Sequence, residues 1–438
     1  MMRSLFSGVA GLKTHQTRMD VIGNNIANVN TVAFKSSSMN FQDMLYQTTQ
    51  AATGANSDTG RAGQNPRQIG LGSTTASINT TIDTAGSAES TGNPFDIYIT
   101  GDSFFVVSPD GGGTQYYTRS GAFNVDEAGT LCMTSNGYAV MGYGTTTDTT
   151  GAVVVDTSAL EPLAIMSSDN MTSAPDATTY AYMSGIIDSE DESFDTTTGK
   201  MVTLQFYDNL GYKYTAKFTI TQTSDTEYAL TVSDVVDSDG TSTGGTNTGT
   251  ATIVFDNTTG ALSSTSDTSF TLTASGLKGS DASIKVDISS LLNYANNGNS
   301  TVSMSRGTSS TDTTGCGWAV GSMTGISIGT DGTIYGTYDN GQTALLGQIP
   351  TATFANASGL SKEGANLYAA SLNSGDATIN DITASGSGSM TTGQLEMSNV
   401  DLAKEFTTMI TTQRGFQANS RIITVSDTLL EELTNLKR

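Results

Sequence analysis

Apolar residues recur with helical spacing at both ends of this 438-residue chain, whereas almost everything between the ends alternates like β-strands. A period of three, four or seven residues places apolar side chains on one stripe of a helix. Such stripes need a partner, and the simplest partner is the other terminus. Any apolar surface left over is available to further copies of the chain. The stripe residues, which we predict to carry self-assembly, are Leu5, Val9, Leu12, Met19, Ile22 and Ile26 near the start, and Leu402, Phe406, Met409, Phe416, Ile423 and Leu430 near the end.

Charge is sparse and unevenly placed. Charged residues make up 14% of the chain, and the net charge is −23. Residues 1–45 carry a net charge of +2 and residues 395–438 a net charge of −1, so the acidity lies between them. A nucleic-acid binder needs a basic face to displace counterions from phosphates. We therefore exclude nucleic acid as a partner and interpret the acidic middle as a solubilising surface.

The middle of the chain is rich in Gly, Thr, Ser, Asn and Asp, which fill the gaps between short apolar runs. This pattern is typical of many short strands joined by tight turns. The predicted fold is mainly β with α-helical termini: paired, coiled-coil-like N- and C-terminal helices, a discontinuous inner β domain and an inserted outer β-sandwich or barrel-like domain. Strands are predicted over 97–99, 104–107, 116–118, 138–140, 202–207, 214–220, 228–232, 253–255 and 270–272.

Shifts in composition predict six segments. These are an N-terminal helix at 1–35, a connector at 36–75, the two parts of the inner β domain at 76–149 and 326–396, the inserted outer β domain at 150–325, and a C-terminal helix at 397–438. Gly- and Thr-rich stretches flank the insert, so we expect it to fold by itself.

Local signals refine the connector and the last helix. Phe41 and the run Met44–Tyr46 favour one short helix in the connector. Ser398, three residues before Asp401, predicts a capping box at the start of the C-terminal helix. The basic pair at 437–438 suits the negative end of its dipole.

Residues for catalysis are missing from the sequence. The single histidine, His15, lies on a polar helix face, where a solvated side chain is the favoured interpretation. No HExxH pair, P-loop, nucleophile elbow or dinucleotide fingerprint occurs. The acidic run Asp188–Asp195 admits a weak calcium loop, but its spacing is not that of an EF-hand and favours a solvated loop. We expect no enzymatic activity, cofactor or metal.

The cysteines and the start of the chain bear on its location. Cys132 and Cys316 are the only cysteines, so a disulfide scaffold and a four-cysteine zinc site are excluded, while a single cross-link stays open. Basic residues interrupt every apolar run near the start, and no stretch approaches ~18 apolar residues. We expect no cleaved leader and no membrane insertion.

Several motifs resemble those of a known family. They are residues 7–12 (SGVAGL), 19–28 (MDVIGNNIAN), 31–35 (TVAFK), 101–106 (GDSFFV), 117–123 (YTRSGAF), 398–402 (SNVDL) and 413–419 (QRGFQAN). They resemble the terminal helices and inner β domain of the bacterial flagellar rod and hook proteins. The large insert and the stretch 335–368 resemble the hook proteins of that family more than its rod proteins.

The resemblance implies a structural subunit that self-polymerises into a curved tubular universal joint, which transmits torque from rod to filament. The helices at both ends would form its axial core domain. The implied partners are further copies of the chain, the distal rod, the hook cap, the hook–filament junction proteins and the flagellar export apparatus. The implied location is the extracellular hook, reached by type III flagellar export without a cleaved signal peptide. Two alternatives are a distal rod component and a β-rich surface adhesin or S-layer-like protein.

Overall fold

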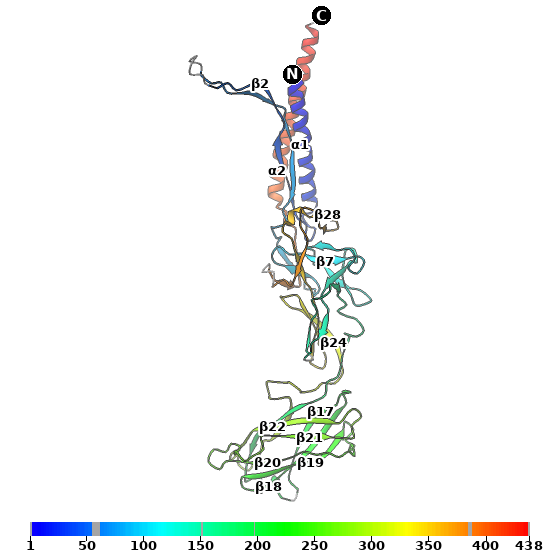
Figure 1. The fold of residues 1–438 in the computed structure, drawn as a ribbon, viewed down its shortest axis with the longest axis vertical. Coiled ribbons are helices and arrows are strands. Elements are labelled where there is room, and N and C mark those ends of the chain that lie inside the picture. The colour runs from blue at the N-terminus through cyan, green and yellow to red at the C-terminus, as the bar shows by residue number, and fades with distance from the viewer. Residues whose placement is uncertain (1, 55–61, 150–151, 197, 384–387, 437–438) are drawn as a thin grey trace. The chain divides into compact units, whose positions relative to one another are not determined.

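The computed structural model describes residues 2–54, 62–149, 152–196, 198–383 and 388–436. As predicted, the described chain is mainly β with an α-helix at each end: α1 spans Met2–Ala27 and α2 spans Leu402–Asn435 (Figure 1). The basic pair at 437–438 lies outside the described residues. The chain forms two compact units, one of Met1–Ser167, Ile326–Tyr335 and Leu345–Arg438, the other of Ser168–Gly325 and Gly336–Ala344. The six-segment division stays a prediction.

Unit 1 contains both helices and an eight-stranded sheet in the order β28-β29-β8-β7-β11-β10-β9, with β14 paired to β11. Phe104, Val106, Tyr117 and Tyr368 form part of its buried core. The strands of this unit are β1 (Ser37–Asp43), β2 (Tyr46–Gln50), β3 (Arg67–Gly70), β4 (Ser73–Thr80), β5 (Ala88–Ser90), β6 (Ile97–Ile99), β7 (Phe105–Ser108), β8 (Tyr116–Thr118), β9 (Phe123–Val125), β10 (Leu131–Met133), β11 (Ala139–Gly142), β12 (Thr145–Thr147), β13 (Val153–Val155), β14 (Glu161–Pro162), β27 (Thr351–Thr353), β28 (Ser361–Gly364), β29 (Leu367–Ala369), β30 (Thr378–Asn380), β31 (Met390–Thr392) and β32 (Gln394–Glu396), with a 3₁₀ turn at Ala357–Gly359.

Unit 2 is a β-sandwich of two four-stranded sheets, β17-β18-β19-β20 and β21-β22-β16-β23. Along β18, alternate residues from Tyr214 to Ile220 are buried, as expected for strands with one face on a core. Strands β16 and β22 pair in parallel. The strands are β15 (Thr172–Ser173), β16 (Tyr180–Ile187), β17 (Lys200–Tyr207), β18 (Lys213–Ser224), β19 (Glu227–Asp237), β20 (Thr250–Val254), β21 (Ser269–Ala274), β22 (Ala282–Asn293) and β23 (Ser303–Arg306), with a 3₁₀ turn at Glu192–Phe194. Strands β24 (Gly321–Ile328), β25 (Thr333–Tyr338) and β26 (Thr343–Gln348) each begin in one unit and end in the other.

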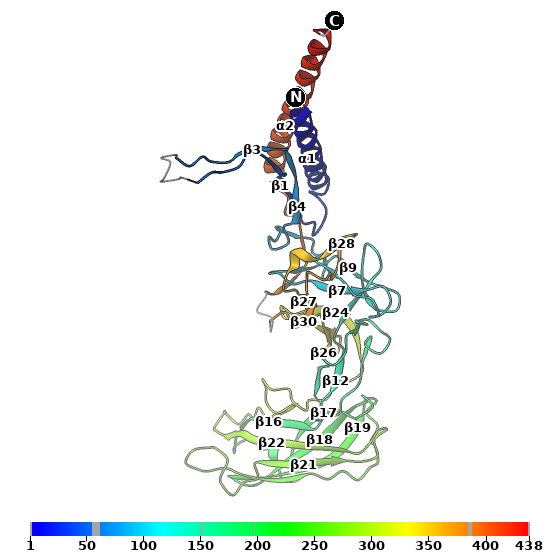
Figure 2. The same ribbon diagram turned by 45° about the horizontal axis from the view of Figure 1, so that its top comes forward.

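The connector differs from the prediction, because Phe41 and Met44–Tyr46 form no helix. β1 pairs along its whole length with β4, from Ser37↔Thr80 to Asp43↔Ser73, and β2 pairs with β3 in a hairpin that projects away from the helices (Figure 2). A helix this short has little intrinsic stability, so backbone pairing with a distant strand prevails.

The start of α2 also differs from the prediction. Asp401, not Ser398, is the N-cap: its carboxylate accepts hydrogen bonds from Ala403 N (2.9 Å) and Lys404 N (3.2 Å). A carboxylate at this position satisfies two free amides and also suits the positive end of the helix dipole. Ser398 instead accepts a hydrogen bond from Val400 N (3.4 Å).

Candidate assembly interface

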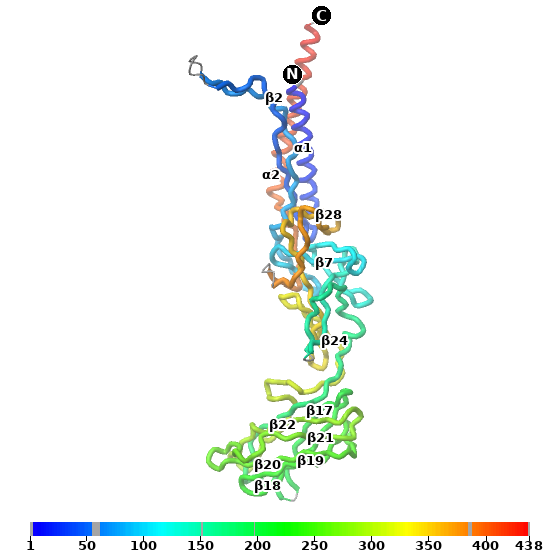
Figure 3. Tube along the Cα trace, in the orientation of Figure 1, coloured from blue at the N-terminus to red at the C-terminus, as the bar shows by residue number. Residues whose placement is uncertain are grey.

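The two helices pack side by side and antiparallel, as the chain trace in Figure 3 shows. Gly8 of α1 lies against Ile423 of α2, and Gly11 lies against Asn419. A Cβ added at Gly11 would fall 2.7 Å from Asn419 Nδ2, so the absence of a side chain allows this close approach. The seam between the helices is therefore narrow.

The predicted stripe residues divide into three groups by exposure. Ile22 is buried. Seven others are half-buried, namely Leu5, Leu12, Met19, Ile26, Met409, Ile423 and Leu430. Val9, Leu402, Phe406 and Phe416 are exposed, each by 40% or more. The helix pair thus covers one part of the stripe and leaves another part open, and the role of these residues in assembly stays a prediction.

Exposed apolar residues occur along both helices, and the sequence stripes identified only some of them. We call these residues together the open face. It consists of Phe6 and Val9 on α1, and Leu402, Phe406, Ile410, Phe416, Ile422, Val425, Leu429 and Leu433 on α2. Large exposed apolar surfaces on a folded chain mark sites of interaction, whereas isolated exposed residues do not.

His15 does not lie on a solvated face, contrary to the prediction. Its half-buried ring lies against Gly415 of α2 and edge-on to Phe41 of β1, with 5.4 Å between ring centroids. The Arg18 guanidinium lies 5.2 Å from the centre of the same Phe41 ring. Burial, and next the charge of Arg18, lowers the pKa of His15. The imidazole therefore acts as a neutral spacer between three elements.

At the base of the helices, polar side chains join the end of α1 to the start of α2. Buried Asn25 donates through Nδ2 to Ser37 O (2.8 Å) and accepts from Ser37 N (3.0 Å). Asn399 accepts from Ser36 N (2.8 Å) and donates to Thr81 O (2.9 Å). These amide side chains satisfy backbone groups that no strand or helix pairs.

A buried ionic cluster lies beside this polar joint, and sequence reasoning missed it. Lys35 Nζ lies 2.8 Å from Glu396 Oε1, and Arg119 Nε lies 2.9 Å from Glu396 Oε2, with every side chain at most 2% exposed. Two of these residues stand inside the family-like motifs 31–35 and 117–123. The sequence contained one usable signal: each motif has a single charged residue among apolar or small residues. Unpaired charges are almost never buried, so a charge in such surroundings indicates a partner of opposite charge elsewhere in the chain.

The acidic run in unit 2 is only partly solvated, because Glu190, Glu192 and Asp195 are exposed whereas Asp188 and Asp191 are buried. Buried Asp188 accepts from Asn296 N (2.6 Å), Gly298 N (2.8 Å) and Glu190 N (3.0 Å). Buried Asp191 accepts from Ser300 N (3.0 Å) and pairs with Lys200 Nζ at 2.9 Å. Burial alone would raise the pKa of Asp191, but hydrogen bonds from Ser193, Lys200 and Ser300 hold it well below its usual range. Protein donors thus occupy the oxygens that a cation would use.

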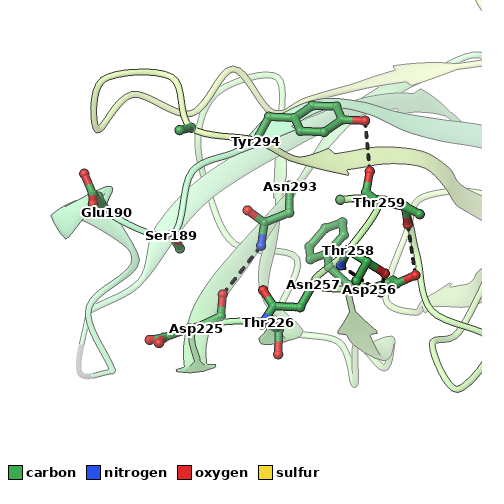
Figure 4. Close-up of a pocket in the computed structure, with 13 residues that line it drawn as sticks. Ser189, Glu190, Asp225, Thr226, Asp256, Asn257, Thr258, Thr259, Asn293 and Tyr294 are labelled. Carbon is green, nitrogen blue, oxygen red and sulfur yellow. Dashed lines mark hydrogen bonds between the residues drawn. The ribbon is translucent and has the colours of Figure 1, made fainter.

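A polar cavity of about 520 Å³ opens beside this run at the ends of several strands (Figure 4). Tyr294 Oη donates to Thr259 O (3.0 Å) on one wall, and Asn293 Nδ2 donates to Asp225 O (3.5 Å) on another. Across the described ranges, no three His, Cys, Asp or Glu residues come together as metal ligands.

Cys132 and Cys316 are not joined: both are free thiols, Cys132 half-buried in β10 and Cys316 buried. Within the described part of the chain, neither helix combines the length and the apolar character needed to cross a bilayer.

Comparisons with known proteins agree with this arrangement. Residues 5–35 match the family described as "Flagella basal body rod protein", residues 98–172 match "Flagellar hook protein FlgE/F/G D1 domain", and residues 391–436 match "Flagellar basal body rod FlgEFG protein C-terminal". The first and third matches include the terminal helices, and the second includes strands β7 to β14 of unit 1.

Whole-chain comparisons extend the match. The flagellar hook protein FlgE of Treponema pallidum is 36% identical over 100% of both chains. The flagellar basal-body rod protein FlgG of Bacillus subtilis is 30% identical over 100% of both chains. The crystal structure of the Helicobacter pylori flagellar hook protein FlgE2 aligns with a TM-score of 0.46 and 16% identity, covering 66% of this chain and 96% of that one.

The terminal helix pair and the matched segments define a rod- or hook-type axial protein of the bacterial flagellum. Within that class, the chain belongs to the flagellar hook protein FlgE family.

Proposed function

We propose that this chain is a structural subunit of a bacterial flagellar hook, and that it polymerises through α1 and α2 into a curved tube. The open face carries the proposal. Phe406 is 49% exposed, Ile410 59% and Val425 57%. Water around these side chains opposes their exposure, so burial against neighbouring copies supplies a driving force for assembly.

The geometry of the seam favours growth into a polymer rather than closure into a dimer. On α2, the exposed residues Leu402, Phe406 and Ile410 lie on a different side of the helix from Val425, Leu429 and Leu433, because successive residues turn by about 100°. A copy bound at one of these sides leaves the other side open for the next copy. Head-to-tail contacts of this kind generate helical filaments when the rotation between copies does not close a ring. A subunit with this role needs no catalytic residues.

The proposed partners follow from the family. They are further copies of the chain, the distal rod, the hook cap, the hook–filament junction proteins and the flagellar export apparatus, and the proposed location is the extracellular hook. We also propose that the chain is exported through that apparatus. Assembly is expected to stabilise the terminal helices further, because burial of the open face adds to the packing of α1 on α2 within one chain.

A second candidate is a straight distal rod component. The sequence pattern suggested that the large insert distinguishes hook proteins from rod proteins. The rod protein FlgG of Bacillus subtilis aligns with the whole of this chain, however, so the insert alone does not distinguish them. Electron microscopy of the polymerised, purified chain decides between them. Curved tubes support the hook subunit, straight shafts support the rod component, and failure to polymerise at any concentration rejects both.

A further inference from the structure

Glu396 lies where the chain leaving α1 meets the chain entering α2. It ends β32, shortly before the N-cap Asp401, and its backbone oxygen accepts a hydrogen bond from Ala33 N (2.7 Å), in the segment that follows α1. Its Oε1 also accepts from Gly86 N (2.9 Å). Three segments far apart in sequence therefore meet at one residue.

The backbone at this meeting point is strained. Ala33 has φ of +57° and is buried, a conformation that residues other than glycine seldom adopt. Such a conformation persists only where the surroundings over-determine it, and strained residues cluster at functional positions. Here the strain turns the chain so that Ala33 N reaches Glu396 O and Lys35 reaches the carboxylate.

The two carboxylate oxygens of Glu396 have separate tasks. Oε1 pairs with Lys35, whose Nζ also donates to Thr84 O (2.9 Å). Oε2 pairs with Arg119, which also donates to Ile99 O (3.2 Å). Arg119 directly follows β8 of the eight-stranded sheet, which we call the inner sheet. One side chain thus connects the exit of α1 to the inner sheet, across 361 residues of sequence on one side and 277 on the other.

The cluster holds two buried cations and one buried anion. Removing the anion would leave both cations unpaired, which is strongly destabilising, whereas removing Lys35 would leave a neutral pair of Arg119 and Glu396. The inner sheet therefore does not depend on Lys35 for its stability. The connection between this sheet and the segment after α1 does depend on Lys35.

We infer that Glu396 is a positioning residue for assembly: through Lys35 and Arg119 it fixes the base of the helix pair on the inner sheet, so that the open face meets the next copy in one orientation. This inference rests on the proposed function, because an orientation matters only if the helices assemble. It predicts that loss of the tie impairs polymerisation even where the β fold is intact.

The test uses the full chain with Lys35→Met, and Lys285→Met at an exposed position on β22 as the matched control. Light scattering gives the critical concentration for polymerisation, and circular dichroism gives the unfolding midpoint of the β structure. We expect Lys35→Met to raise the critical concentration about tenfold and to leave the midpoint within about 3 °C of wild type. The control should change neither value.

Glu396→Gln supplies the second measurement, with Glu89→Gln at an exposed position on the paired strand β5 as its control. Glu396→Gln should abolish polymerisation and lower the β midpoint, because it leaves two buried cations without a buried negative charge. Polymerisation of Lys35→Met at the wild-type concentration would overturn the inference alone, and so would a collapse of its β midpoint. Failure of wild type and both controls to polymerise would reject the proposed function as well.

Discussion

Gly415 of α2 lies directly against the imidazole of His15 on α1: a Cβ added at position 415 would fall 2.6 Å from His15 Cε1 and 2.7 Å from Nε2. Real Cβ atoms do not approach another heavy atom this closely, so either the imidazole ring or one of the two helices would have to shift. The distance between α1 and α2 at this level is therefore set by one missing side chain and one ring.

Gly415→Val should weaken the helix pair. The added Cβ meets the imidazole ring and carries two further methyl groups, and overpacking of this kind costs about 1–3 kcal/mol. The expected result is a lower temperature of polymer dissociation, followed by light scattering. Gly23→Val on α1 is the control, since a Cβ there meets nothing within 4 Å.

A double variant tests whether the clash is with His15 itself. His15→Ala removes the ring, so His15→Ala combined with Gly415→Val should recover most of the loss, giving a coupling free energy of about 1 kcal/mol or more. Additive effects of the two substitutions would show that the helices are held apart by something else.

Sequence periodicity predicted this helix pair, but it did not predict which residues pack between the helices and which stay exposed. The apolar spacing of Leu12, Ile22 and Ile423 identified the stripe. It did not identify which stripe residues the partner helix covers, because that depends on where Gly11 and Gly415 let the backbones approach. His15 was misassigned for the same reason: its neighbours come from α2 and β1, which no local pattern contains.

Strands were predicted best where alternation was strong, as in β17 and β18. The long strand β22 was missed although Ile284, Val286 and Ile288 alternate with polar residues, which is the pattern of a half-buried strand. The pairing of Lys35 and Arg119 with Glu396 could not be predicted, since the paired residues lie hundreds of positions apart in the sequence. Long-range polar pairing leaves almost no trace in one sequence, whereas one-sided burial leaves a period.

The open face and the seam should respond differently to substitution. Phe406→Ser removes a 49% exposed ring from the open face and should leave the unfolding of the unassembled chain unchanged. In the polymer it should cost about 2 kcal/mol or more per contact, which raises the critical concentration about thirtyfold.

Ile22→Ala is the counterpart, because Ile22 is buried within one chain. It should cost about 2–5 kcal/mol in the stability with which α1 packs in unit 1, measured as loss of helical circular dichroism on heating. An equal loss of helix stability in both variants would mean that the open face is not a contact between copies.

The β-sandwich of unit 2 should lose stability in acid through Asp191. Because its pKa is held below the ordinary value of 3.8, Asp191 contributes stability that is present above about pH 3.8 and is lost as pH falls further. Asp191→Asn should therefore lower the stability of the sandwich by about 1–3 kcal/mol at pH 7 and flatten its dependence on pH between about 4 and 2.

Thermal unfolding at a series of pH values measures both effects. Asp239→Asn, at an exposed position after β19, is the matched control and should change neither. Some acid sensitivity should persist in Asp191→Asn, because hydrogen bonds from Asn296 N and Glu190 N also lower the pKa of Asp188. A wild-type sandwich as stable at pH 2 as at pH 7 would contradict this account of the acidic run.

The last prediction separates the curvature of the polymer from its assembly. If the helix pair and unit 1 build the tube and unit 2 biases its curve, a chain that joins Ser167 to Ile326 through a short Gly/Ser linker should still polymerise, into straight or irregular tubes. Sequence segmentation suggested residue 149 as the junction, but residues 150–167 belong to unit 1 and include Leu163 and Ile165, which are at most 3% exposed. Joining 149 to 326 would empty those two core positions, each worth about 2–5 kcal/mol, and should destabilise unit 1. Electron microscopy of both shortened chains beside wild type makes the comparison. Normal curvature in the chain joined at 167, or no assembly by it at all, would refute the assignment of curvature to unit 2.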